Sequence, residues 1–166
     1  MSVPVVSVVG RSNVGKTTFL EKLIRELKRR GHRVGTIKHY EHDFEVDQPG
    51  KDSWRHAQAG SDVVVISSPH KLALIRRMNE ELPLAEIVAT MLPVDIVLTE
   101  GYKREDRPKI EVFRQALGSK LLCAQHELIA VVTDRLFAIP VPQFELDDAC
   151  GVADLLEGKY ILAETL

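Results

Sequence analysis

The sequence predicts one three-layer α/β domain with a mostly parallel sheet and an inserted antiparallel hairpin. Short runs rich in valine and isoleucine, such as residues 3–9 and 128–132, have the length and composition of strands buried on both faces of a sheet. Residues 17–30 carry apolar side chains at intervals of three and four, as an amphipathic helix does. Gly31 follows as its C-terminal cap, and residues 33–38 then form a second strand, parallel to the first.

The length, net charge and composition of the chain indicate which class of protein it belongs to. A chain of 166 residues is long enough for one domain with a real core, which we expect to span residues 1–166. The net charge of −2 offers no surface for nucleic acid or for a membrane. The N-terminus lacks the features of a signal peptide, no apolar run approaches the ~20 residues of a membrane span, and Cys123 and Cys150 fit no metal or disulfide pattern. We therefore expect a cytoplasmic protein.

The loop after the first strand predicts a phosphate-binding site. Residues 10–18 read GRSNVGKTT and match G-x-x-x-x-G-K-[ST] at every fixed position, between a strand and a helix. Its glycines allow backbone N–H groups to point at an anion, the lysine reaches the β- and γ-phosphates, and the first threonine binds magnesium. A plain glycine turn would explain neither the lysine nor the threonine. The predicted nucleotide-binding residues of this loop are Gly10, Asn13, Val14, Gly15, Lys16, Thr17 and Thr18.

The polar segment from His39 to His56 follows the second strand, so it emerges at the same edge of the sheet as the phosphate loop. Three interpretations stay open. One is a metal site formed by His39, His42 and His56, although their spacing fits no zinc pattern. The others are a contact to substrate or to magnesium-bound water, and a solvated loop. A short helix is expected over residues 53–59.

Residues 61–78 predict the hairpin, with strands over 63–67 and 72–77. Its outer edge is a candidate dimer interface; the alternative is an edge blunted by Arg76 and Arg77. Pro83 is expected to occupy the first position of the next helix.

Two acidic residues flank the strand predicted over 94–99. Asp95 and Glu100 lie roughly 16 Å apart along an extended strand. Ligands bind beyond the carboxyl ends of parallel strands, so Glu100 is the candidate on the magnesium side, together with Thr17. Asp95 is expected to be a turn or capping residue at the other end.

Further strands are predicted over 110–113 and 128–132, and a helix over 147–156. Asp134 follows the last strand and is a candidate to accept hydrogen bonds from the N1 and N2 donors of guanine. The motif it resembles, [NT]-K-x-D, lacks its lysine here, so a simple turn aspartate is the alternative. The basic residues Lys103, Arg104 and Arg107 form either a solvated loop or an anion contact.

Several motifs together resemble the molybdopterin-guanine dinucleotide biosynthesis protein B family (MobB). They are the phosphate loop, Lys38-His39, Gly50-Lys51-Asp52-Ser53, Arg55-His56, Ala59-Gly60 and Thr99-Glu100-Gly101-Tyr102-Lys103. The resemblance runs from Val3 to about Glu157. It implies a P-loop protein that binds GTP and Mg²⁺ and assists a MobA-type guanylyltransferase in attaching GMP to molybdopterin, usually as a homodimer. It also implies that Asp52 and Arg55, the candidate catalytic residues, lie near the γ-phosphate.

The leading hypothesis is thus a GTP-binding accessory protein with weak hydrolysis, since no glutamine is placed to orient a water and no clear arginine finger is present. The rival is a P-loop small-molecule kinase, for which the segment from Lys103 to Arg107 would be a short lid. A third possibility is a binding module in which the nucleotide is only a structural ligand.

Overall fold

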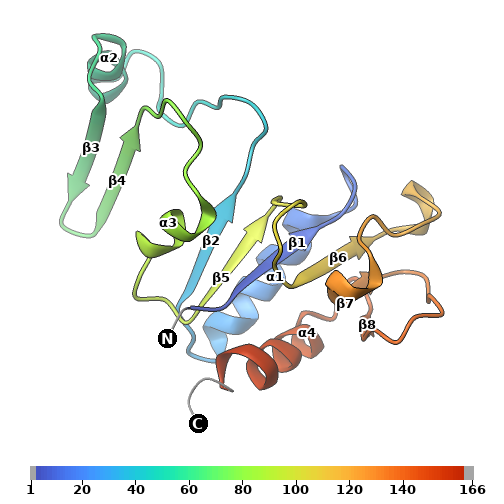
Figure 1. The fold of residues 1–166 in the computed structure, drawn as a ribbon. Coiled ribbons are helices and arrows are strands. Elements are labelled where there is room, and N and C mark those ends of the chain that lie inside the picture. The colour runs from blue at the N-terminus through green and yellow to red at the C-terminus, as the bar shows by residue number, and fades with distance from the viewer. Residues whose placement is uncertain (1–2, 163–166) are drawn as a thin grey trace. The chain divides into compact units, whose positions relative to one another are not determined.

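The computed structural model describes residues 3–162, and they form two compact units (Figure 1). One unit consists of residues 3–39 and 91–162 and holds the parallel sheet. The other consists of residues 40–90 and holds the hairpin, so it is longer at both ends than the insertion expected at about 61–78. No helix within residues 3–162 is long and apolar enough to cross a membrane.

The larger unit is built on a six-stranded sheet in the order β2-β5-β1-β6-β7-β8, and every neighbouring pair is parallel. The predicted α/β class with a parallel sheet is therefore confirmed. The first two strands of the chain do not pair with each other, because β5 lies between them. The strands are β1 (Val5–Val9), β2 (Val34–Lys38), β5 (Ile96–Glu100), β6 (Lys109–Phe113), β7 (Leu128–Thr133) and β8 (Gln143–Phe144).

Two helices, α1 (Lys16–Arg29) and α4 (Ala149–Leu156), pack on one face of this sheet. The apolar side chains of α1 recur at helical spacing, and Leu23 and Leu27 are fully buried against the even-numbered side chains of β1. Gly31 ends α1 with a φ of 93°, which confirms it as the C-terminal cap. Burial of these side chains provides the main stabilisation of the unit.

The start of α4 differs from the sequence prediction. Asp148 precedes the helix and accepts a hydrogen bond from the backbone N–H of Gly151 at 2.8 Å, so it is the N-cap. Asp147 lies one residue earlier and pairs with Lys22 of α1. The two acids are thus outside the first turn, where a helix beginning at residue 147 would have placed them.

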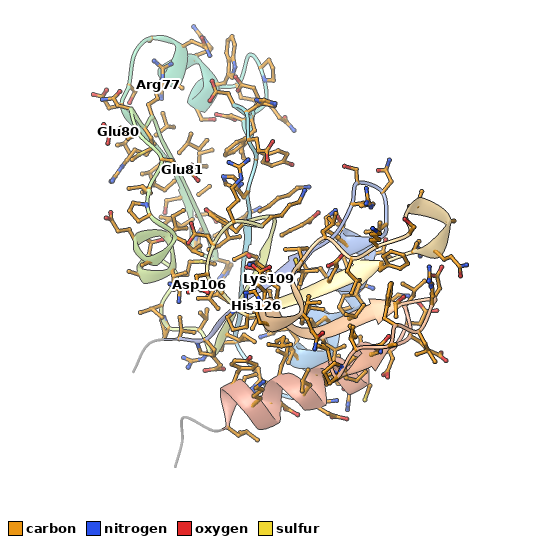
Figure 2. All side chains as sticks on the ribbon, turned by 45° about the vertical axis from the view of Figure 1, so that its right-hand side comes forward. Arg77, Glu80, Glu81, Asp106, Lys109 and His126 are labelled. Carbon is orange, nitrogen blue, oxygen red and sulfur yellow. The ribbon has the colours of Figure 1, made fainter. Side chains whose placement is uncertain are left out.

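Strand β6 carries two buried charged residues that the apolar pattern did not predict. Lys109, labelled in Figure 2, is 1% exposed and pairs with Glu127. Glu111, also 1% exposed, accepts backbone hydrogen bonds from Leu122 at 2.7 Å and Cys123 at 3.0 Å. Each buried charge therefore has a partner. Burial and these carboxylates raise the pKa of the Cys123 thiol to about 12, so it stays protonated.

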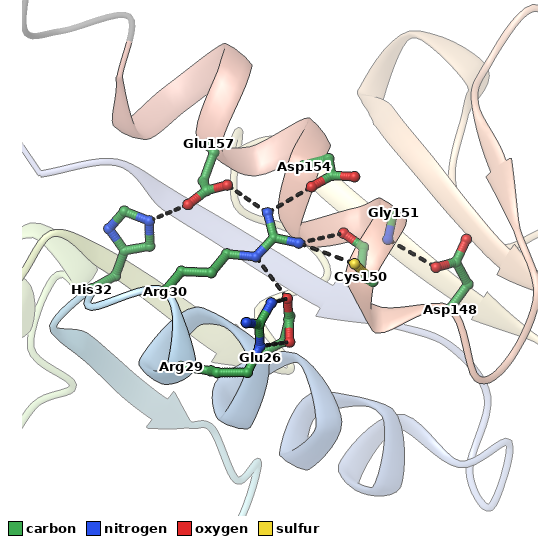
Figure 3. Close-up of polar contacts among 9 residues, drawn as sticks. All are labelled: Glu26, Arg29, Arg30, His32, Asp148, Cys150, Gly151, Asp154 and Glu157. Carbon is green, nitrogen blue, oxygen red and sulfur yellow. Dashed lines mark hydrogen bonds and ion pairs between the residues drawn. The ribbon is translucent and has the colours of Figure 1, made fainter.

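Arg30 connects the ends of α1 and α4 (Figure 3). Its guanidinium donates to Glu26 at 2.7 Å, to Asp154 at 2.6 Å and to Glu157 at 2.5 Å. Glu157 also contacts the His32 ring at 2.5 Å. These pairs hold the C-terminal helix to the turn between α1 and β2.

The smaller unit has an antiparallel pair, β3 (Val63–Ser68) and β4 (Lys71–Arg76), as predicted. This pair forms its own sheet, so it does not add strands to the parallel one. The unit also contains α2 (Asp52–Gln58) and α3 (Leu84–Ala89), which Pro83 precedes as N-cap. Arg77, labelled in Figure 2, donates to the carbonyl of Ala57 and ties the hairpin to the end of α2.

Short helical turns in the larger unit are η1 (Gln115–Leu117), η2 (Gln125–Glu127) and η3 (Glu157–Ile161).

Candidate functional site

Four polar or loop-forming positions follow four neighbouring strands at one edge of the parallel sheet. They are Gly10 after β1, Glu100 at the end of β5, Arg114 after β6 and Asp134 after β7. Since all these strands are parallel, their carboxyl ends share one edge, which is where ligands bind in such sheets. Three of these positions were predicted from the sequence, and Arg114 was not.

The loop after β1 has the backbone of an anion nest. Gly10, Asn13 and Gly15 have φ values of 147°, 63° and 97°, in the region that ordinary residues seldom adopt. A Cβ on Gly10 would lie 2.4 Å from the carbonyl oxygen of Val112, so only glycine fits there. Left-handed residues among right-handed ones turn successive N–H groups inward, and α1 begins at the next residue, Lys16. The loop is therefore suited to bind a phosphate group.

The Lys16 ammonium folds back over this loop. It donates to the carbonyl of Gly10 at 3.1 Å and to that of Arg11 at 2.7 Å. Its burial lowers its pKa, the charge of Glu100 opposes that effect, and the charges of Lys103 and Lys38 add to it. An anionic ligand beside the ammonium would therefore offset the cost of its burial.

Thr17 and Glu100 come together as predicted. The Thr17 hydroxyl lies 3.1 Å from one Glu100 carboxylate oxygen and 3.2 Å from the other. A hydroxyl and a carboxylate are hard oxygen ligands, and magnesium commonly takes one or two such groups together with phosphate oxygens and water. The residues present therefore fit a magnesium ion bound beside the phosphate loop.

Asp95 lies at the opposite end of the same strand region, also as predicted. It accepts the backbone N–H of Arg33 at 2.7 Å and the Arg33 guanidinium at 2.5 Å. These hydrogen bonds hold the pKa of the Asp95 carboxyl below its usual value. Asp95 therefore has a structural role in the turn that leads into β2.

Arg114 contacts the phosphate loop from the neighbouring strand. Its Nε donates to the carbonyl of Val14 at 2.8 Å, and a Cβ on Gly15 would lie 3.5 Å from its terminal Nη2. The signal in the sequence was its position, directly after the buried run of β6, which is the same position that identified Glu100 and Asp134. The guanidinium thus lies along the Val14–Gly15 end of the loop.

Asp134 lies at the rim of a cavity of about 580 Å³. One of its carboxylate oxygens accepts the backbone N–H of Gln115 at 2.8 Å, and within residues 3–162 the other makes no hydrogen bond. Phe144 and Asp147 also line this cavity, which has the volume of a small-molecule site. Through Gln115, Asp134 is linked to the same segment that carries Arg114.

The smaller unit holds the predicted candidates His42, Asp52, Arg55 and His56. Asp52 and Arg55 are both on α2 and form an exposed ion pair of 3.8 Å. Their place near the γ-phosphate stays a prediction. No group of three or more His, Cys, Asp or Glu side chains that could hold a metal occurs within the described part of the chain, which includes His39, His42 and His56. Lys103, Arg104 and Arg107 are exposed in the loop after β5.

Comparison with known proteins gives consistent matches. The model of the family "Molybdopterin guanine dinucleotide synthesis protein B" matches residues 5–134. A molybdopterin-guanine dinucleotide biosynthesis adapter protein of Escherichia coli is 36% identical over 93% of this chain and 91% of its own length. The one from Haemophilus influenzae is 35% identical over 93% and 88%.

Solved structures that resemble this chain belong to the same family as its sequence relatives. A crystal structure of molybdopterin-guanine biosynthesis protein B superimposes with a TM-score of 0.72 at 30% identity, over 93% of this chain and 97% of that one. Bacillus subtilis MobB superimposes with a TM-score of 0.74 at 28% identity, over 95% and 98%. The chain therefore belongs to the molybdopterin-guanine dinucleotide synthesis protein B family.

Proposed function

We propose that this protein is a GTP-binding adapter in the formation of the molybdopterin guanine dinucleotide cofactor. In this role it assists a MobA-type guanylyltransferase in attaching GMP to molybdopterin. The relatives at 36% and 35% identity are named as biosynthesis adapter proteins for this dinucleotide. The proposal extends that role to the chain and adds the nucleotide and the metal.

The observation that carries the proposal is the loop from Gly10 to Thr18 at the carboxyl edge of the sheet. Its three left-handed residues, the ammonium of Lys16 and the start of α1 provide N–H donors and positive charge at one point. A triphosphate would replace the two carbonyl oxygens that now accept from Lys16. Nearby, Thr17 and Glu100 would supply oxygen ligands for a Mg²⁺ ion, whose charge would offset that of the phosphates.

Guanine is the base that the cavity at the end of β7 would prefer. Guanine presents two adjacent N–H donors on N1 and N2, and Asp134, which lines this cavity, has one carboxylate oxygen that makes no hydrogen bond within residues 3–162. Asp147 brings a second carboxylate to the same cavity, and Phe144 offers an aromatic ring for stacking. Adenine lacks the N1 donor, so a carboxylate there favours guanine.

Hydrolysis by this protein alone is expected to be weak. The site supplies contacts for phosphate and magnesium, but efficient hydrolysis also needs a group that orients the attacking water and a cation on the developing charge. Asp52 and Arg55 are the candidates for these roles, and they pair with each other on an exposed helix. An adapter that binds GTP and turns it over slowly fits this arrangement.

We also propose a homodimer formed through the hairpin. One face of β3 and β4 presents only apolar side chains in its central part, where Val65 and Leu74 form a cross-strand pair and are 51% and 53% exposed. Val63 and Leu72 extend the same face. Apolar faces of this kind on soluble proteins usually mark interaction surfaces.

The test is a nucleotide panel by titration calorimetry in the presence of magnesium. The wild-type protein should bind GTP more tightly than GDP and ATP. Lys16→Ala should abolish measurable triphosphate binding and leave the thermal unfolding midpoint unchanged, because the ammonium contacts only loop carbonyls. Lys28→Ala, an exposed lysine later in α1, is the matched control. Unaltered GTP affinity in Lys16→Ala would exclude the phosphate site.

A further inference from the structure

Arg114 is held at one end of the phosphate loop with part of its guanidinium unused. Its Nε donates to the Val14 carbonyl at 2.8 Å, which fixes the plane of the group against the loop. Among residues 3–162, neither of its terminal nitrogens makes a hydrogen bond or an ion pair. Arginine presents several donors in one rigid fork, so a single anchoring bond leaves the outer donors fixed in direction.

The position of Arg114 along the loop differs from that of Lys16. The ammonium of Lys16 contacts Gly10 and Arg11 at the start of the loop, whereas the guanidinium lies against Val14 and Gly15 at its end. In a phosphate loop the lysine serves the β- and γ-phosphates. The backbone of such a loop cradles the α- and β-phosphates, so the α-phosphate, nearest the nucleoside, is the one that the lysine does not reach.

Arg114 also lies next to the cavity proposed for the base. The next residue, Gln115, donates its backbone N–H to Asp134, which lines that cavity. The positive charge of Arg114 contributes to the lowered pKa of Asp147, another lining residue, after the larger effect of Lys22. The guanidinium therefore lies against the loop after β1 and within electrostatic range of a residue that lines the cavity.

We infer that Arg114 is a nucleotide-binding residue that contacts the α-phosphate through its free terminal nitrogens while Nε keeps its hydrogen bond to Val14. The inference depends on the proposed nucleotide site and adds a second cationic contact to it. A planar guanidinium suits a phosphate because two of its donors can meet two oxygens of one group. Arg114 would thus fix the nucleoside end of the ligand as Lys16 fixes the terminal end.

The experiment compares Arg114→Gln and Arg114→Lys with the wild type for GTP and GDP binding. Both nucleotides contain the α-phosphate, so Arg114→Gln should weaken both by the same factor, about 10- to 100-fold. Arg114→Lys should recover part of this loss, since it keeps the charge but has a single donor group. Lys16→Ala should instead weaken GTP more than GDP. Arg25→Gln, an exposed arginine of α1 paired with Glu21, is the control and should change neither affinity.

A second readout separates direct contact from support of the loop. In phosphorus NMR spectra of bound GDP at saturating protein, Arg114→Gln should shift the α resonance and leave the β resonance in place. The unfolding midpoint without nucleotide should fall slightly, by the loss of the one hydrogen bond to Val14. GTP affinity within twofold of the wild type would overturn the inference. Equal shifts of both resonances would also overturn it and reduce Arg114 to a residue that anchors the loop. If the wild type bound no nucleotide, the proposed function itself would fail.

Discussion

Glu100 and Asp95 show how position along one strand assigns different roles to two carboxylates. Glu100 faces the hydroxyl of Thr17 at the carboxyl edge of the sheet, whereas Asp95 is held by Arg33 at the other end. Both residues lie beside the same apolar run, so their chemistry alone does not distinguish them. The direction of β5 within the parallel sheet distinguishes them, because it places Glu100 at the carboxyl edge.

Glu100→Gln should weaken the magnesium dependence of GTP binding, because an amide keeps the shape of the side chain but loses the charge that attracts the ion. Asp95→Asn should leave nucleotide binding unchanged and lower stability by about 1 to 3 kcal/mol, since it removes charged hydrogen bonds to Arg33. Calorimetry with and without magnesium, together with urea unfolding of both variants, measures these effects. If Asp95→Asn changed the magnesium dependence and Glu100→Gln changed only stability, the roles given to the two carboxylates would be wrong.

Among single residues, the sequence predicted those that belong to a recognised motif. The spacing of Gly10, Gly15, Lys16 and Thr17 is enough to predict the loop, because all the residues that form it are close together in the sequence. Arg114 could not be predicted in the same way, since its contact with Val14 depends on β6 lying next to β1. That neighbour relation joins residues 100 positions apart.

At the scale of elements, the junction of α1 with α4 links stability to pH. Glu26 accepts hydrogen bonds from the guanidinium groups of Arg29 and Arg30, which lower the pKa of its carboxyl to about 2. Glu157 also has a lowered pKa, chiefly through His32. The folded state therefore binds these protons less readily than the unfolded chain does.

The sign of the effect follows from this difference. The ordinary pKa of Glu26 is 4.5, so its contribution to stability is complete above that pH and is lost as the pH falls towards about 2. We expect the urea midpoint to drop over this range, and Glu26→Gln to make the drop shallower while lowering the midpoint at pH 7. Glu21→Gln, in a looser pair at 3.4 Å, is the control. If the urea midpoint of Glu26→Gln fell with pH as steeply as that of the wild type, the Glu26 carboxylate would not contribute to the loss of stability in acid.

The hairpin gives the second prediction at this scale. We expect the wild type to be a dimer at micromolar concentration by light scattering. Leu74→Lys should weaken dimerisation at least about tenfold, because it places a charge within the apolar face. Ser68→Lys, at the turn end of β3, should leave the dimer intact. A monomeric wild type at this concentration would contradict the proposal directly.

Elements with a strong local pattern were predicted closely. Helix α1, the hairpin and the buried strands differ from their expected bounds by one or two residues, because each has a local signal of its own. The helix has apolar residues at intervals of three and four, the hairpin has a turn between two β-rich runs, and the buried strands are unbroken apolar runs. Strand β8 was missed, since Gln143 and Phe144 form too short a run, after Pro142, to show any period. Strand β6 was predicted without Lys109, whose burial depends on a partner 18 residues later, Glu127.

For the whole molecule, the order β2-β5-β1-β6-β7-β8 explains why the site lies where it does. It places the loop of residues 10–18, the proposed phosphate site, between Glu100 on one side and Arg114 with Asp134 on the other. The chain order of the strands does not specify this arrangement, because β5 follows the residues of the smaller unit yet inserts between β1 and β2. The sequence thus identified most site residues, and only the topology shows how they are grouped.

The last prediction separates nucleotide binding from catalysis. The purified protein should bind GTP in preference to ATP, and Asp134→Asn should reduce that preference by about 1 to 3 kcal/mol, since an amide leaves a guanine donor without its acceptor. GTP turnover by the protein alone should be slow, because the proposed site would hold phosphate and magnesium without a positioned water.

Adding a MobA-type guanylyltransferase and molybdopterin should then increase guanine dinucleotide formation, and Lys16→Ala should remove the increase. The two parts test different claims: the variant of Asp134 tests the base site, and the variant of Lys16 tests whether an occupied phosphate loop is needed for the adapter role. Lys28→Ala should behave as wild type in both assays. Rapid phosphorylation of an added small-molecule acceptor by the protein alone would instead identify a kinase. The segment from His39 to His56 would then be the first place to look for the acceptor.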